Sequence, residues 1–125
     1  MRKIVLVDDH ADIRRLIRIT LGKAFEVFEA EDGASGLDLV RRQRPDLVVL
    51  DVMMPGGLDG IKVLDAIKAD PALLHTRVIM VTARGQQQDY QLGMSLGADA
   101  YFIKPFSPLE LVTRIHELLA GAECQ

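Results

Sequence analysis

Residues 46–55, Asp46-Leu47-Val48-Val49-Leu50-Asp51-Val52-Met53-Met54-Pro55, decide the fold. The apolar run Leu47–Leu50 is rich in valine and leucine, which is typical of a strand covered on both faces, as in a parallel sheet between helix layers. An ionised carboxylate is rarely buried without a partner. Asp51, at the end of this run, therefore indicates a functional site.

Three other apolar runs also end in polar side chains. The pairs are Ile4–Val7 with Asp8 and Asp9, Val78–Val81 with Thr82, and Tyr101–Ile103 with Lys104. Because the carboxyl ends of parallel strands meet at one edge of a sheet, we expect these side chains to form a single site.

Strand and helix patterns alternate five times along the chain. The expected strands are Ile4–Val7, Phe25–Ala30 as an edge strand, Leu47–Leu50, Val78–Val81 and Ala100–Ile103. The expected helices are one containing Ile13 to Leu21 and capped by Gly22, a second over Ala34 to Arg44, a third from about Ile61 to Asp70, a fourth over Gln86 to Leu96 with few apolar anchors, and a fifth starting at Ser107-Pro108-Leu109-Glu110. This alternation predicts an α/β fold, a flavodoxin-like (βα)5 three-layer sandwich with parallel strand order 2-1-3-4-5.

Composition favours one ordinary domain. The chain has 125 residues, and its net charge of −3 gives no reason to expect nucleic acid or an anionic membrane as a direct partner. The one cysteine fits a reducing cytoplasm, and the short apolar run after Met1-Arg2-Lys3 is neither a signal peptide nor a membrane span. We expect a domain over residues 1–120 and a tail or the start of a linker over 121–125.

Three carboxylates at one sheet edge need a cation, because like charges at close range repel. Carboxylate oxygens suit a hard divalent ion, most naturally Mg²⁺. Lys104 and the Thr82 hydroxyl add a cation and a donor, so Asp8, Asp9, Asp51, Thr82 and Lys104 have the chemistry for phosphoryl transfer to a carboxylate.

The sequence resembles the receiver (response regulator) domain of two-component signal transduction systems over residues 2–120. The motifs are Val7-Asp8-Asp9, Asp51-Val52-Met53-Met54-Pro55 with Asp59-Gly60, Val81-Thr82-Ala83, Gly97-Ala98-Asp99-Ala100-Tyr101 and Lys104-Pro105-Phe106.

This resemblance implies a role for each site residue. Asp51 would accept a phosphoryl group from a histidine kinase or a histidine phosphotransfer protein. Mg²⁺ would be held by Asp9, Asp51, the Met53 backbone carbonyl and, through water, Asp8. Thr82, Lys104 and the Ala83 backbone N–H would bind the phosphoryl oxygens, Thr82 and Tyr101 would form the switch, and the Lys104–Pro105 bond would be cis.

The resemblance also implies an output. Phosphorylation would change the surface of the fourth helix, fifth strand and fifth helix and so control a downstream effector domain or protein. A phosphorylation-dependent dimer through this surface stays open. The protein would not be an enzyme, although it would assist its own phosphorylation and dephosphorylation.

Two details depart from the family or extend it. The loop Pro55-Gly56-Gly57-Leu58-Asp59 has one residue more than is common in the family. We further hypothesise that Arg84 pairs with a phosphoryl oxygen and that dephosphorylation is slow.

Other readings stay open at this point. An aspartate-nucleophile phosphatase of the haloacid dehalogenase type uses similar groups, but its Asp-x-Asp motif is absent, since Met53 stands two residues after Asp51. A phosphorylation-independent interaction domain with the same fold is a second alternative. Asp8-Asp9 alone could cap the first helix, and we interpret His10, His75 and His116 as surface residues that bind no metal.

Overall fold

The computed structural model describes residues 1–53, 59–83 and 87–123. The strands are β1 (Arg2–Val7), β2 (Phe25–Ala30), β3 (Leu47–Asp51), β4 (Arg77–Thr82) and β5 (Ala100–Ile103). The α-helices are α1 (Ala11–Leu21), α2 (Gly33–Gln43), α3 (Gly60–Ala69), α4 (Gln87–Ser95) and α5 (Pro108–Glu123). The short 3-10 helices η1 (Gly22–Ala24) and η2 (Pro71–Leu73) follow α1 and α3. Every predicted strand and helix is present, and the boundaries differ by only a few residues.

The five strands form one parallel sheet in the order β2-β1-β3-β4-β5. This confirms the predicted topology and the place of β2 at an edge. The strand order reverses between β1 and β3, so the carboxyl ends of these two strands lie at the topological switch, where ligands of such sheets bind.

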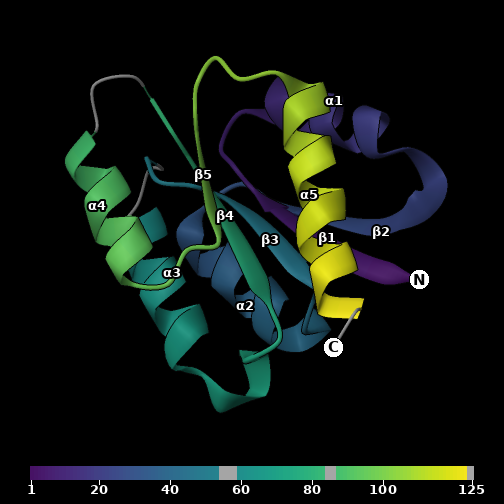
Figure 1. Ribbon diagram of the computed structural model, residues 1–125. Coiled ribbons are helices and arrows are strands. Elements are labelled where there is room, and N and C mark those ends of the chain that lie inside the picture. The colour runs from purple at the N-terminus through teal and green to yellow at the C-terminus, as the bar shows by residue number, and fades with distance from the viewer. Residues whose placement is uncertain (54–58, 84–86, 124–125) are drawn as a thin grey trace.

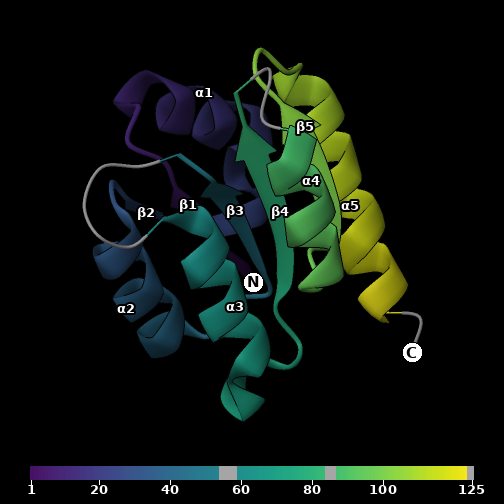
Figure 2. The ribbon, with the colours of Figure 1, turned by 90° about the vertical axis from the view of Figure 1, so that its left-hand side faces the viewer.

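Helices cover both faces of the sheet (Figures 1 and 2). One core lies between the sheet and helices α2 and α3, and includes Val48, Leu50, Leu64, Ile67 and Met80. The other lies between the sheet and helices α1 and α5, and includes Ile17, Leu47, Val49, Leu111 and Ile115. Alternate residues of β3 thus point to opposite cores, which explains why this strand is apolar throughout.

The helix ends follow their local sequence signals. Gly22 ends α1 with a positive φ of 69°, a conformation that glycine adopts without a steric penalty. Asp59 caps α3 by accepting a hydrogen bond from the Lys62 N–H, and the Ser107 hydroxyl accepts one from the Glu110 N–H at the start of α5. Arg44 ends α2 in the left-handed region, with φ of 47°.

The alternative that Asp8 and Asp9 cap α1 is wrong. The N-cap residue is His10, and no side chain caps this helix. The two aspartates stand before the helix and are free to belong to the site.

Candidate phosphoryl-acceptor and metal site

Asp51 lies at the centre of the site, on the last residue of β3. Its side chain is almost fully buried, with 3% of the residue surface exposed. Asp51 Oδ1 accepts a hydrogen bond from the Met53 N–H at 3.1 Å, and Lys104 Nζ lies 3.1 Å from Asp51 Oδ2. The carboxylate is therefore held in a fixed orientation from both sides.

Lys104 joins two strand ends. Its Nζ lies 3.1 Å from Asp8 Oδ2 as well as 3.1 Å from Asp51 Oδ2. Asp8 follows β1 and Lys104 follows β5, so the sheet brings together residues that are far apart in the sequence. The predicted meeting of Asp8, Asp51 and Lys104 is confirmed, as is the cis Lys104–Pro105 bond.

The electrostatics of Asp51 are those of a crowded carboxylate. Burial, and then the neighbouring charge of Asp8, raise the pKa of Asp51 to about 6, although the ammonium group of Lys104 opposes this rise. Burial alone would lower the pKa of Lys104, but Asp51 and Asp8 outweigh it and raise the pKa. One ammonium thus pairs with two carboxylates, and the negative charge left at the site favours a further cation.

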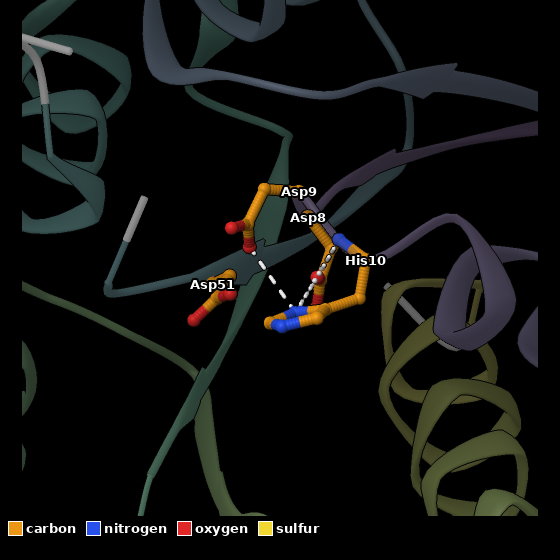
Figure 3. A group of neighbouring side chains, drawn as sticks. All are labelled: Asp8, Asp9, His10 and Asp51. Atoms are coloured by element: carbon orange, nitrogen blue, oxygen red, sulfur yellow. Dashed lines mark hydrogen bonds and ion pairs between the residues drawn. The ribbon is translucent and has the colours of Figure 1, made fainter. Parts of the chain in front are cut away.

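Asp8, Asp9, His10 and Asp51 can each direct one ligand atom into the same small volume, with these atoms within 4.8 Å of one another. Figure 3 shows the His10 ring lying among the three carboxylates. Asp8 and Asp51 are buried, whereas Asp9 and His10 are exposed. Hard carboxylate oxygens that are partly open to solvent are suitable ligands for a divalent cation, so the donor set fits the metal that the sequence predicts.

Thr82 ends β4, the strand beside β3. It is buried, with 1% of its surface exposed, and its hydroxyl has no hydrogen-bond partner in the part of the chain that the structure describes. A buried hydroxyl without a partner is costly. A ligand oxygen that completes this hydrogen bond would remove the cost, which is what the predicted phosphoryl-binding role requires.

Replacing Thr82 by valine is expected to raise the free energy of unfolding by about 1 kcal/mol, because a methyl group fills the place of the unpaired hydroxyl. Urea denaturation measures this change. The matched control is Thr76→Val: Thr76 is equally buried, but its hydroxyl donates to the Pro45 carbonyl at 2.8 Å, so this change should lower stability by about 1–3 kcal/mol. Loss of stability in both variants would contradict the account of Thr82.

Tyr101 lies on β5 and packs against the core on the α2/α3 side of the sheet. Its ring meets the Tyr90 ring of α4 edge-to-face, with centroids 4.9 Å apart. Tyr101, one of the two predicted switch residues, therefore connects β5 to α4, two elements of the predicted output surface.

The structure bears only in part on Met53 and Ala83, and not at all on two other predicted features. Met53 contributes the N–H that binds Asp51, and its side chain is exposed; Ala83 follows β4 and is also exposed. The Gly56-Gly57 loop and Arg84 lie outside the described residues.

Sequence reasoning missed two residues beside the site. His10 is exposed, as expected, and its ring lies in the carboxylate cluster, a placement that the sequence does not predict; the interpretation that it binds no metal stays a prediction. Arg14 donates to the Asp8 backbone carbonyl and pairs with Glu29 at 2.9 Å, which ties α1 and β2 to the turn that carries Asp8. The sequence feature that could have identified Arg14 is its position one helical turn before Arg18, because both arginines then lie on one face of α1 and contact Glu29.

Among the described residues, no helix is both long enough and apolar enough to cross a bilayer.

Comparison with known proteins gives a consistent result. The response regulator receiver domain family matches residues 4–116. The phosphate regulon transcriptional regulatory protein PhoB of Escherichia coli (strain K12) is 40% identical over 119 residues, which are 94% of this chain and 52% of PhoB. The chain spans about half the length of the curated relatives it matches.

Solved structures agree with this match. The chemotaxis protein CheY4 of Vibrio cholerae is 29% identical with a TM-score of 0.84, over 94% of this chain and 98% of CheY4. The beryllofluoride-activated DrrB receiver domain is 31% identical with a TM-score of 0.85, over 96% of this chain and 98% of that domain. The sheet order, the acidic cluster and these matches lead to one conclusion: the chain belongs to the response regulator receiver domains of two-component systems.

Proposed function

We propose that the chain is a phosphorylation-dependent signalling switch in which Asp51 accepts a phosphoryl group with Mg²⁺. One observation carries the proposal: the buried Asp51 carboxylate shares the Lys104 ammonium with Asp8, and the next strand ends in the Thr82 hydroxyl, which has no partner among the described residues. Such a carboxylate is oriented for nucleophilic attack, and its surroundings suit the charge of the transferred group.

The donor would be a phosphohistidine of a sensor kinase or a histidine phosphotransfer protein. An Asp51 oxygen would form a bond to phosphorus while the phosphorus–nitrogen bond breaks and its electron pair returns to the imidazole. Thr82, Lys104 and the Ala83 N–H would bind the phosphoryl oxygens. The domain would not be an enzyme with a separate substrate. The same groups would instead assist the phosphorylation and dephosphorylation of the domain itself.

Asp9 and Asp51 would bind Mg²⁺ directly with the Met53 backbone carbonyl, and Asp8 would act through a bound water. When bound, the ion would neutralise negative charge on the carboxylates and on the transferred group. The protein's own part is to hold the carboxylates at one point, and the contacts of Asp8 and Asp51 with Lys104 support this.

The donor would reach Asp51 past Lys104. An apolar groove of about 360 Å³ lies beside Lys104 and is lined by Ile13, Leu16, Ile17, Pro105, Phe106 and Pro108. Because Asp51 itself is almost fully buried, a phosphodonor protein must seat part of its surface next to the site, and this groove can receive apolar side chains.

The output would be the surface of α4, β5 and α5. Tyr90, Leu92 and Met94 of α4 and Ile103 of β5 are large apolar side chains that are substantially exposed. Thr82 precedes α4 in the sequence, and Tyr101 packs against Tyr90 of α4. A movement of the Thr82 hydroxyl toward a phosphoryl group would therefore change the position of α4. A downstream effector domain or protein would read this change, with a phosphorylation-dependent dimer as a further outcome.

Residues 1–120 would form the receiver domain, and residues 121–125 would be a tail or the start of a linker. The greater length of PhoB and MtrA is compatible with an effector domain elsewhere in the whole protein. Nothing in the comparisons favours the phosphatase alternative or a phosphorylation-independent domain.

Hydrogen exchange tests the switch. Adding beryllofluoride with Mg²⁺, a mimic of the phosphoryl group, is expected to change amide exchange in α4 and β5 while leaving α2 unchanged, because only α4 and β5 adjoin Thr82 and Tyr101. The Asp51→Asn variant serves as the control and should show no response. Identical exchange in α4 with and without the mimic would contradict the proposed switch.

A further inference from the structure

The acidic cluster contains an imidazole. Three of its four side chains are the carboxylates of Asp8, Asp9 and Asp51, and the fourth is His10. Magnesium is normally bound by oxygen ligands, so a nitrogen donor in this position is not needed for Mg²⁺.

The position of the His10 ring matches that of a metal ligand. Its Nδ1 lies 3.0 Å from Asp8 Oδ1 and 3.2 Å from Asp9 Oδ1. Ligand bonds of about 2.1 Å at right angles place neighbouring donor atoms about 3.0 Å apart. The His10 nitrogen and the Asp9 oxygen, 3.2 Å apart, are therefore spaced like adjacent corners of one coordination sphere.

The backbone keeps the ring in place. The His10 N–H donates to Asp8 Oδ1 at 2.8 Å, and His10 is the N-cap residue of α1. Half of the side chain is exposed, at 55%, so a hydrated ion can approach the nitrogen from solvent. Figure 3 shows the ring directed into the cluster rather than away from it.

His10 Nδ1 faces two carboxylate oxygens and an ammonium group. Two oxygens that only accept and one ring nitrogen meet within 3.2 Å, and the Lys104 ammonium stands 3.5 Å from the same nitrogen. Either a proton on Nδ1 or a metal ion can join these groups. The two possibilities differ in what happens when imidazole is replaced by an amide, which can donate a proton but is a poor ligand for nitrogen-preferring metals.

We infer that His10 is a metal ligand through Nδ1 and that it shifts the preference of this site from Mg²⁺ toward divalent ions that accept nitrogen, such as Ni²⁺ and Co²⁺. The inference rests on the proposed function, because it needs a divalent ion at Asp51. Imidazole suits late first-row metals, whereas carboxylate and water suit Mg²⁺. The residue would thus decide which ion the site takes at a given ion concentration.

Equilibrium metal binding, without any phosphodonor, tests the inference. Calorimetric titrations with Mg²⁺ and with Ni²⁺ would compare the untagged chain with His10→Asn, both in a Cys124→Ser background that removes the one thiol. The His10→Asn change is expected to weaken Ni²⁺ binding about tenfold or more. Loss of a residue that only hydrogen-bonds to a metal ligand already lowers metal affinity about 10- to 100-fold. Mg²⁺ binding should change less than about twofold, because water replaces the imidazole readily on this ion.

The quantity compared is the change in affinity for each ion from the parent chain to His10→Asn, and not the affinities themselves. Late first-row metals bind most sites more tightly than Mg²⁺, whatever the role of His10. His75→Asn is the matched control: His75 is also exposed, but its ring lies beside the Arg44 carbonyl, away from the cluster. In the Co²⁺-loaded chain, a paramagnetically shifted imidazole signal should be present in wild type and His75→Asn and absent in His10→Asn.

Equal losses for both ions in His10→Asn, or no loss for either, would overturn the inference and leave His10 as a hydrogen-bond donor to the carboxylates. Asp51→Asn separates this failure from that of the proposed function. Mg²⁺ binding that depends on Asp51 but shows no His10-dependent preference overturns the inference alone. Mg²⁺ binding that is equally strong in Asp51→Asn, or the absence of Mg²⁺ binding in the parent chain, overturns the proposed metal site and the inference together.

Discussion

Asp51→Asn is expected to raise the free energy of unfolding at pH 7 by about 2–3 kcal/mol in the absence of divalent ions. The wild-type fold buries a charged carboxylate next to Asp8, and this is why the pKa of Asp51 rises from 3.8 to about 6. Asparagine keeps the shape and removes the charge, although its NH2 group replaces the oxygen that accepts from Lys104. The charged Asp51 carboxylate thus lowers the stability of the fold, and replacing it by asparagine restores that stability.

The pH dependence follows from the direction of the shift. The folded-state pKa of Asp51 lies above the unfolded value of 3.8, so between about pH 4 and pH 6 the folded chain binds more protons than the unfolded chain. The contribution of Asp51 therefore destabilises the fold progressively as the pH rises through this window. The difference between wild type and Asp51→Asn should be full at pH 7 and vanish below about pH 4.

Urea denaturation of both proteins at pH 7 and pH 4 measures this difference. Asp38→Asn is the matched control, because Asp38 is an exposed carboxylate of α2 that pairs with Arg42, and its loss should change stability by less than about 1 kcal/mol. Saturating Mg²⁺ should narrow the gap at pH 7, since the ion binds the wild-type carboxylates. A less stable Asp51→Asn variant at pH 7 would contradict the electrostatic account of the site.

Gly60→Ala is expected to lower the free energy of unfolding by about 3 kcal/mol or more. Gly60 begins α3, and its N–H donates to the Val52 carbonyl at 3.0 Å. A Cβ atom there would lie 2.2 Å from the Asp51 carbonyl oxygen and 2.7 Å from Val52 Cα. These are backbone atoms at the end of β3, so relief of the clash must move the residue that carries the acceptor carboxylate.

Gly93→Ala provides the matched control for this change. Gly93 lies inside α4, and a Cβ atom there would meet nothing closer than the Met80 side chain at 3.7 Å. Because alanine favours a helix over glycine, this variant should gain about 0.5–1 kcal/mol. Urea denaturation of the two variants measures both changes. Equal stability of Gly60→Ala and wild type would show that α3 does not approach β3 as closely as described.

The sequence predicted the fold well because the strands are unambiguous. Leu47–Leu50 and Val78–Val81 are apolar on both faces, and only a sheet covered by two helix layers buries such runs. The meeting of Asp8, Asp51 and Lys104 followed from the same logic, since each ends or follows a parallel strand.

The remaining details depend on conformations that a residue pattern does not encode. His10 joins the cluster because it is the N-cap of α1, where its backbone turns the ring back toward Asp8 and Asp9. Arg14 reaches the Asp8 carbonyl only because α1 packs beside β2 and Glu29. Both facts need the relative placement of helix and sheet, which side-chain periodicity leaves undetermined.

The central claim is that Asp51 accepts a phosphoryl group with the help of a divalent ion. The most direct measurement is the intact mass of the chain after incubation with a small acyl phosphate and Mg²⁺, for wild type and Asp51→Asn, each with and without a chelator. The account predicts the gain of one phosphoryl group in wild type with Mg²⁺ and no gain in the other three samples. No gain in wild type, or an equal gain in Asp51→Asn, would contradict it.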